Sequence, residues 1–120
     1  MKSAQPTRIQ PTRGEVWMAD LEPVRGHEQG QKRPVLVISA NAFNTSRADL
    51  VIVLPITSKE KHIRSHVLVK PQEGGLKQRS FIITEQVHCI AKERLAKRMG
   101  AISRETLALV ETLLRVLLEL

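Results

Sequence analysis

Cysteine and aromatic residues are scarce in this chain of 120 residues, which has one cysteine, Cys89, one Trp, two Phe and no Tyr. A single cysteine cannot form an intrachain disulfide and indicates a reducing compartment. We expect Cys89 to be a small buried side chain rather than a nucleophile. Four scattered histidines lack the spacing of a metal site, so we expect no metal and no cofactor. Three aromatic residues are too few for a base-stacking platform, which argues against RNA-binding modules of that type.

Long apolar runs are also missing. None is long enough to span a bilayer, and residues 1–13 contain no apolar segment typical of a signal peptide. We therefore expect a cytoplasmic protein with no membrane contact. A hydrophobic content of 42% over this length predicts one domain with a packed core. Residues 1–13 are polar and contain two prolines, so we expect a flexible arm there and a single domain over residues 14–120.

Acidic residues are outnumbered, with 12 Asp and Glu against 19 Lys and Arg, which gives a net charge of +7. The excess lies in residues 59–104, which hold eleven basic and four acidic residues. A basic surface of this kind suggests a polyanion or an acidic protein as partner. The alternative is that the charge only keeps the protein in solution.

The most distinctive stretch is the polar segment 26–34, which is followed at once by four apolar residues. This pattern predicts a polar loop that leads into a buried strand. Pro34 suits the first residue of a strand, so we expect Arg33 to be the last loop residue, beside a rigid element. The alternative is a solvated surface loop with an ordinary ion pair between Glu28 and Arg33.

The rest of the pattern is mainly β. Short apolar runs rich in β-branched residues predict strands at residues 15–21, 35–39, 50–56, 66–70, 81–84, 87–90 and 97–102. We expect a helical turn within residues 91–95. We also expect Phe43 to anchor the polar connection 41–49, and Pro55 to mark a bulge or a departure from the strand ladder.

The C-terminal segment has a helical pattern. Ser103 is a good N-cap, and an apolar stripe with helical spacing follows it. The stripe is broad enough to indicate self-association. Many short strands, one long helix and no alternation of strands with helices predict a small barrel-like sheet with one helix.

Residues 26–38 read GHEQGQKRPVLVI and resemble the signature of the MazF/PemK family of toxin endoribonucleases. The resemblance covers nearly the whole domain and includes RGEVW at 13–17, ADLEP at 19–23, VLPITS at 53–58 and EQV at 85–87. It implies a mainly β fold with a C-terminal helix, namely a small SH3-like barrel. It also implies a homodimeric toxin that cleaves single-stranded messenger RNA with sequence preference and without metal. The implied inhibitor is a cognate acidic antitoxin of the MazE or PemI type.

The family's functional residues fall on positions of this chain. The resemblance places the catalytic arginine at Arg33 and the threonine at Thr57, and it places the loop glutamate at Glu28. We expect further contacts to RNA from a set of polar and charged residues: Gln29, Gln31, Lys32, Ser58, Lys59, Lys61, Arg64, Lys77, Arg79, Glu85 and Gln86.

The PemK-like branch shares a histidine with this chain, at His27. That branch also has an arginine and an aspartate in its fifth strand, where this chain has Ile83 and Glu85. Because the arginine is missing, the acid–base set of the branch cannot be carried over whole. Glu85 is then either a participant in cleavage or a structural carboxylate.

The chemistry of RNA cleavage agrees with these residue types. The 2′-hydroxyl of RNA can attack the adjacent phosphate if it is activated, if the growing charge is stabilised and if the leaving oxygen is protonated. Arg33 suits the second task because its guanidinium stays protonated and offers two parallel donors. Thr57 can donate a hydrogen bond to a phosphate oxygen. His27 or Glu28 is the better proton acceptor by type.

Two alternatives remain open at this point. One is a toxin on the same fold that is not an enzyme, like the gyrase-binding CcdB, and the other is a plain basic RNA-binding barrel. The polar loop argues against the first, because a gyrase-binding protein needs no cleavage loop. Cleavage of single-stranded RNA in EDTA would support the ribonuclease alone.

Overall fold

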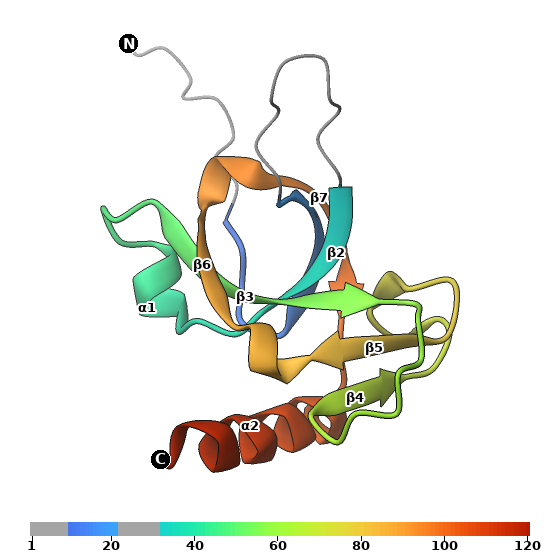
Figure 1. The fold of residues 1–120 in the computed structure, drawn as a ribbon. Coiled ribbons are helices and arrows are strands. Elements are labelled where there is room, and N and C mark those ends of the chain that lie inside the picture. Colours follow the sequence, from blue (N-terminus) through green and yellow to red (C-terminus); the bar gives the residue numbers. More distant parts are fainter. Residues whose placement is uncertain (1–9, 22–31) are drawn as a thin grey trace, which may run out of the picture.

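The computed structural model describes residues 10–21 and 32–120. This part of the chain forms seven strands: β1 (Glu15–Asp20), β2 (Lys32–Val37), β3 (Leu50–Thr57), β4 (His66–Val69), β5 (Ser80–Ile83), β6 (His88–Ala91) and β7 (Leu95–Ala101). It also forms two α-helices and three 3₁₀ turns (Figure 1): α1 (Asn41–Asn44), α2 (Arg104–Leu118), η1 (Glu73–Gly75), η2 (Thr84–Gln86) and η3 (Lys92–Arg94).

The strands form one antiparallel sheet in the order β4-β5-β3-β2-β1-β7, and β6 pairs with β3 beside this path. The sheet curls, so that β7, β2, β3 and β6 surround one part of the core (Figure 1). This arrangement confirms the predicted barrel-like, mainly β fold with a C-terminal helix. The predicted helical turn near residues 91–95 is confirmed by η3.

The central strands are buried on both faces, which explains their continuous apolar runs. In β2, Val35 and Val37 face the inside of the curled sheet, whereas Leu36 between them faces the opposite side. The inner cluster consists of Trp17, Ala19, Val35, Val37, Val51, Val53, Ile90 and Leu95.

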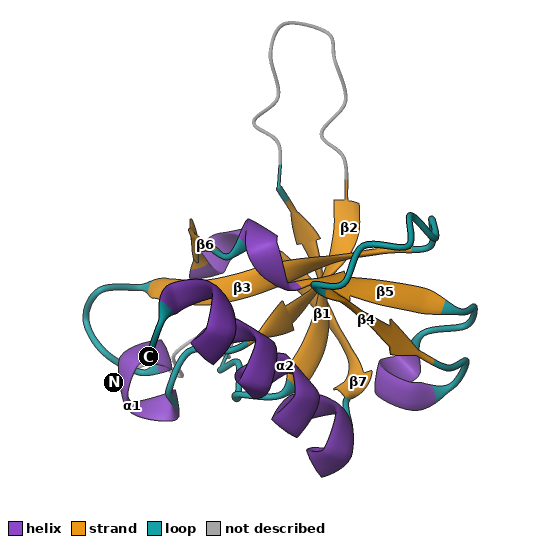
Figure 2. Cartoon of the chain, turned by 60° about the horizontal axis from the view of Figure 1, so that its bottom comes forward, coloured by secondary structure: helices purple, strands orange, loops and turns teal. Residues whose placement is uncertain are grey.

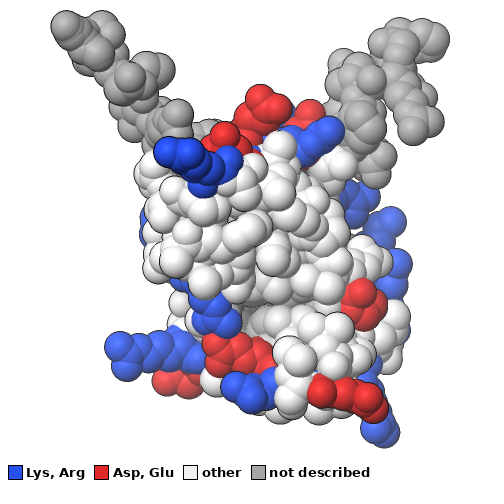
Figure 3. Space-filling model, turned by 90° about the vertical axis from the view of Figure 1, so that its left-hand side faces the viewer, with Lys and Arg blue, Asp and Glu red and all other residues white. Residues whose placement is uncertain are grey.

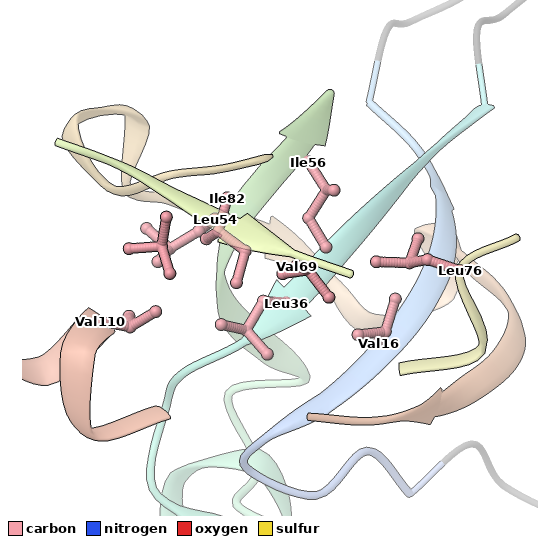
Figure 4. Packing of buried hydrophobic residues seen from close by; sticks show 9 residues of the cluster. Val16, Leu36, Leu54, Ile56, Val69, Leu76, Ile82 and Val110 are labelled. Atoms are coloured by element: carbon pink, nitrogen blue, oxygen red, sulfur yellow. The ribbon is translucent and has the colours of Figure 1, made fainter. Parts of the chain in front are cut away.

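Helix α2 covers the opposite face of the sheet. Its fully buried Val110 packs against a second cluster that includes Leu36, Leu54 and Ile82 (Figure 4). The helix begins as predicted, because the Ser103 side chain accepts a hydrogen bond of 3.1 Å from the backbone N–H of Thr106. Figure 2, with α2 at the front, shows the helix lying across the sheet.

The predicted start of the second strand is wrong. β2 begins at Lys32, so Arg33 and Pro34 lie within the strand, opposite Ala19 and Met18 of β1. β2 pairs with β3 only from Val35 onwards, so the edge of β2 that faces β3 has no paired residue at Pro34. A proline is tolerated at such a position because it has no backbone N–H to donate. Arg33 is therefore fixed by strand pairing rather than placed at the end of a loop.

Pro55 neither ends nor breaks β3. It pairs with Val35 of β2, and β3 continues to Thr57. On its other side, β3 pairs with β6 over residues 50–53 and with β5 over residues 56–57. Pro55 thus occupies the interval between two partners, where no backbone donor is required.

Two predicted burials are also wrong. The connection 41–49 contains the short helix α1, and its anchor is the fully buried Asn44 rather than the partly exposed Phe43. The Asn44 amide donates to the Ser39 carbonyl at 3.1 Å, and the Lys92 ammonium donates to the Asn44 carbonyl at 2.7 Å. Cys89 is exposed, because side chains alternate along β6 and its neighbour Ile90 is the one that packs into the inner cluster.

Candidate active site

A pocket of about 810 Å³ opens where the start of β2 meets the end of β3. Its apolar part consists of Met18, Pro34, Ile56, Gly75, Leu76, Ala96 and Met99. Its polar and basic part consists of Lys32, Arg33, Thr57, Ser58, Lys59, Lys77, Gln78, Ser80, Lys97 and Arg98. The space is comparable with sites that enclose a drug-sized ligand, which span about 300–1,000 Å³.

The strand register brings Arg33 and Thr57 together. Val35 of β2 lies opposite Pro55 of β3, and two further residues along each antiparallel strand lead to Arg33 and Thr57. Thr57 is the last residue of β3, and its hydroxyl accepts a hydrogen bond of 3.1 Å from the backbone N–H of Lys59. Both side chains line the pocket. Two neighbouring strands therefore hold the two predicted catalytic residues that the structure describes.

The pocket is strongly cationic. Six of its lining residues are Lys or Arg, and none of the lining residues is acidic. Arg98 is paired through its Nε with Glu15 Oε2 at 2.7 Å. Within the described residues, no ion pair engages the four lysines Lys32, Lys59, Lys77 and Lys97. Such a pocket concentrates a positive potential and attracts anions.

A glycine contact forms one wall of the pocket. Gly75 has φ +75°, and a Cβ atom added there would lie 2.1 Å from the Met99 carbonyl oxygen. The turn η1 therefore lies directly against β7, and only glycine fits at this contact. This contact fixes the position of Lys77, two residues further on.

Several predicted RNA-contacting residues do not line the pocket. Lys61, Arg64, Arg79, Glu85 and Gln86 all lie outside its lining. Arg79 pairs with Glu60 at 2.5 Å, and its guanidinium carbon lies 5.2 Å from the centre of the Phe81 ring. The hydrogen bond from Arg79 holds the pKa of the Glu60 carboxyl below its usual value.

Glu85 holds two neighbouring residues in place. Ser65 donates its hydroxyl to Glu85 Oε1 at 2.5 Å, and Nε2 of the nearly buried His66 lies 3.0 Å from Glu85 Oε2. Ser80 begins β5 and lines the pocket, whereas Glu85 follows the other end of that strand. This geometry favours the structural role for Glu85 over a role in cleavage.

Replacing Glu85 by glutamine is expected to remove an acid-sensitive part of the stability. Burial raises the pKa of Glu85, but the hydrogen bonds from Ser65 and His66 outweigh it and leave the pKa below 4.5. The ionised carboxylate therefore stabilises the fold above pH 4.5, and this contribution is lost as the pH falls through the lowered pKa. Thermal melting at neutral pH should show a lower Tm for Glu85→Gln, and the gap to the wild type should shrink near pH 3.

Glu93→Gln is the matched control, since Glu93 is exposed and makes no hydrogen bond or ion pair with the described residues. A gap that stays constant down to pH 3 would contradict the role given to the Glu85 carboxylate.

Four predicted site residues, His27, Glu28, Gln29 and Gln31, lie outside the described residues. The last residues of the predicted arm 1–13 are described, and Arg13 pairs with Glu111 of α2 at 2.7 Å. Within residues 10–21 and 32–120, no cluster of three or more His, Cys, Asp or Glu side chains could hold a metal ion. No helix in the same ranges has the length and apolarity needed to cross a membrane.

The sequence did not identify the β7 wall of the pocket, formed by residues 96–99. Lys97 and Arg98 belong to the basic stretch 59–104, which is the only sequence signal for them. Their position depends on β7 pairing with β1, at the other end of the chain. Local pattern does not reveal such a pairing.

The chain is a small protein with a curled antiparallel sheet and a terminal helix. Its cationic pocket suits an anionic substrate. The model of the PemK-like, MazF-like toxins of type II toxin–antitoxin systems matches residues 12–118. The chain belongs to this toxin family.

Individual relatives agree with this assignment. The chain is 34% identical over 113 residues to endoribonuclease MazF9 of Mycobacterium tuberculosis, covering 90% of this chain and 96% of the relative. It is similar to MazF from Deinococcus radiodurans, with TM-score 0.78, 26% identity, and 94% of this chain and 100% of that chain covered. MazF in a MazE–MazF complex from the same organism gives TM-score 0.82 and 26% identity, with 94% and 99% covered. These matches favour the ribonuclease over the gyrase-binding alternative.

Proposed function

We propose that this toxin is an endoribonuclease that cleaves single-stranded messenger RNA with sequence preference and without a metal ion, and so inhibits translation and growth. The observation that carries the proposal is the convergence of Arg33 and Thr57 in a pocket with six basic and no acidic lining residues. The 34% identity to a relative named an endoribonuclease supports it. Its substrate is found in the cytoplasm, where we propose that it acts.

In the proposed reaction, the 2′-hydroxyl attacks the adjacent phosphorus and loses its proton, while the 5′-oxygen of the next nucleotide leaves and gains one. The products are a 2′,3′-cyclic phosphate and a 5′-hydroxyl. Arg33 offers two parallel hydrogen bonds to the phosphate oxygens as their negative charge grows. The surrounding lysines supply positive charge of the kind that a metal supplies elsewhere.

Positioning of the phosphate and removal of the 2′-hydroxyl proton fall to different residues. Thr57 donates its hydroxyl to a phosphate oxygen and positions the group without changing its own ionisation. His27 or Glu28 is the proposed proton acceptor for the 2′-hydroxyl, because each changes protonation within an accessible pH range. The general base is one of these two residues in the proposal.

Cleavage is expected to persist in EDTA and to leave a 2′,3′-cyclic phosphate and a 5′-hydroxyl. A long RNA of mixed sequence, incubated with the protein in EDTA, would give the cut sites and the chemistry of both ends. The control substrate carries 2′-deoxyribose at one mapped cut site and should resist cleavage there. Cleavage at the deoxy position would rule out attack by the 2′-hydroxyl.

The proposed assembly is a homodimer. Eight large apolar side chains are exposed in the described residues: Ile63, Leu68, Val87, Leu109, Val116, Leu117, Leu118 and Leu120. Five of them lie on α2 or just beyond its end, so the broad apolar stripe predicted for this helix is only partly covered within one chain. The side of the molecule that carries α1 and β6 also has few charged side chains at its centre (Figure 3). These surfaces are suited to a second copy.

The second proposed partner is an acidic antitoxin of the MazE or PemI type. The similar Deinococcus toxin was solved together with MazE. The net charge of +7 and the cationic pocket favour an acidic segment that competes with RNA. This inhibition by competition is part of the proposal.

A further inference from the structure

The pocket extends past Arg33 and Thr57 to the edge strand β7. In the register of β1 with β7, Met18 lies opposite Lys97 and Trp17 lies opposite Arg98. Trp17 faces the inner cluster, whereas Met18 lines the pocket. Because side chains alternate along a strand, Lys97 shares the Met18 side of the sheet and Arg98 shares the Trp17 side, and both residues line the pocket.

Two irregularities in β7 frame this pair of residues. Met99 and Ala96 have no partner in the register with β1, so β7 carries one extra residue on each side of the pair. Such bulges re-aim side chains and are frequent beside functional sites. On the Trp17 side of the sheet, Arg98 forms an ion pair with Glu15. The Glu15 carboxylate also accepts a hydrogen bond of 3.0 Å from the Trp17 indole. Arg98 is thus held by a carboxylate, whereas Lys97 has no ion-pair partner among the described residues.

Lys77 approaches the same part of the pocket from the η1 side. The close contact of Gly75 with Met99, together with the burial of Leu76, fixes the backbone just before Lys77. Lys77 and Lys97 both line the pocket, and no acidic side chain lies between them in its lining. Both ammonium groups therefore attract an anion that enters this part of the pocket.

We propose that Lys97, together with Lys77, binds a backbone phosphate of the RNA one or two nucleotides from the cut. This inference rests on the proposed function. Strands lie about 4.8 Å apart, so β7 and β2 are separated by roughly 10 Å, with β1 between them. Arg33 and Lys97 line the same pocket, so a strand of RNA bound along it with its scissile phosphate at Arg33 places a neighbouring phosphate near Lys97. Met18 of β1 lies between these two strands, opposite both Pro34 and Lys97, and offers apolar surface to the intervening sugar or base.

The first test measures RNA binding. The probe is a fluorescent oligonucleotide spanning a mapped cut site, with 2′-deoxyribose at that site to prevent cleavage. We expect Lys97→Ala to weaken binding about three- to tenfold and to lower the slope of log affinity against log salt by about 0.7, the value for one phosphate on a single strand. Lys70→Ala is the matched control, because Lys70 is exposed and lies outside the pocket lining. It should change neither quantity.

The second test locates the phosphate. Uncharged methylphosphonate linkages are placed one at a time on each side of the cut. One position should weaken binding by the wild type and have little further effect on Lys97→Ala, since the contact is already missing. Single-turnover cleavage at subsaturating RNA should fall by the same factor as binding, because Lys97 is proposed to contact the substrate.

The outcomes separate this inference from the proposed function. An absence of any RNA cleavage by the wild type would overturn the proposed function. Normal cleavage with equal affinity and equal salt slope for Lys97→Ala and the wild type would overturn the Lys97 site alone. The same holds if every methylphosphonate acts equally on both proteins.

Discussion

Replacing Arg33 by lysine is expected to slow RNA cleavage about a hundredfold while RNA affinity stays close to that of the wild type. Loss of one well-placed donor to a developing oxyanion costs roughly 3 kcal/mol of transition-state stabilisation. Lysine keeps the charge that attracts the phosphate, but it replaces a planar pair of donors with a single point charge. The backbone at this position is fixed by the pairing of Arg33 with Ala19, so the guanidinium has a defined direction.

Single-turnover cleavage, RNA affinity and thermal melting would be measured together for this variant. Arg47→Lys is the control, since Arg47 is exposed in the connection after α1 and does not line the pocket. Arg33→Ala should lose more activity than Arg33→Lys, and Thr57→Ala should lose less, because it removes a neutral hydrogen bond. Wild-type cleavage by Arg33→Lys would mean that the residue contributes charge alone. Unfolding of that variant would favour the structural ion pair with Glu28.

Replacing Gly75 by alanine is expected to lower the free energy of unfolding by about 3 kcal/mol. The left-handed backbone costs an alanine about 1–2 kcal/mol. A further 1–3 kcal/mol comes from overpacking, because the new Cβ would meet the Met99 carbonyl, a backbone atom that cannot rotate away. The expected fall in Tm is roughly 10 °C. RNA affinity should fall as well, since the displaced turn carries Lys77.

Gly14→Ala separates the two contributions. Gly14 also has a positive φ, +94°, but a Cβ atom added there would lie 3.8 Å from its nearest neighbour, Leu107 Cδ2. This variant should therefore lose only the cost of backbone strain and keep its RNA affinity. Equal losses of stability in the two alanine variants would show that the contact of η1 with β7 contributes nothing.

The elements of the fold were predictable where burial imposes a simple pattern. The runs at 35–38 and 50–56 are apolar on both faces, which is typical of buried strands. Ser103 is a typical N-cap residue and predicts the start of the helix that follows it. The boundaries near Arg33 were less predictable, because strand pairing with β1 extends β2 through a proline. The anchor of the connection 41–49 was also missed, because Asn44 is buried through hydrogen bonds that depend on Ser39 and on the distant Lys92.

The same reason limits what could be predicted of the site. Arg33 and Thr57 were found through a resemblance that covers nearly the whole domain, and the register of β2 with β3 brings them together. Arg79 was expected to contact RNA, yet its guanidinium donates a hydrogen bond to Glu60, which lies 19 positions away in the sequence. Beyond its place in the basic stretch 59–104, Lys97 shows no signal in the sequence, since its place in the pocket depends on two bulges and on a strand from the other end of the chain.

The position of Pro55 has a consequence for how the chain finds its register. β6 pairs with β3 up to Val53, and the proline beyond it offers no backbone donor on which that ladder could lengthen. The last residues of β3 therefore pair with β5 instead of β6. A slip of one residue would turn Thr57 away from Arg33 and toward the opposite face of the sheet. Pro55 thus marks the point where β3 changes partner from β6 to β5, next to the aligned candidate catalytic residues, although it takes no part in the chemistry.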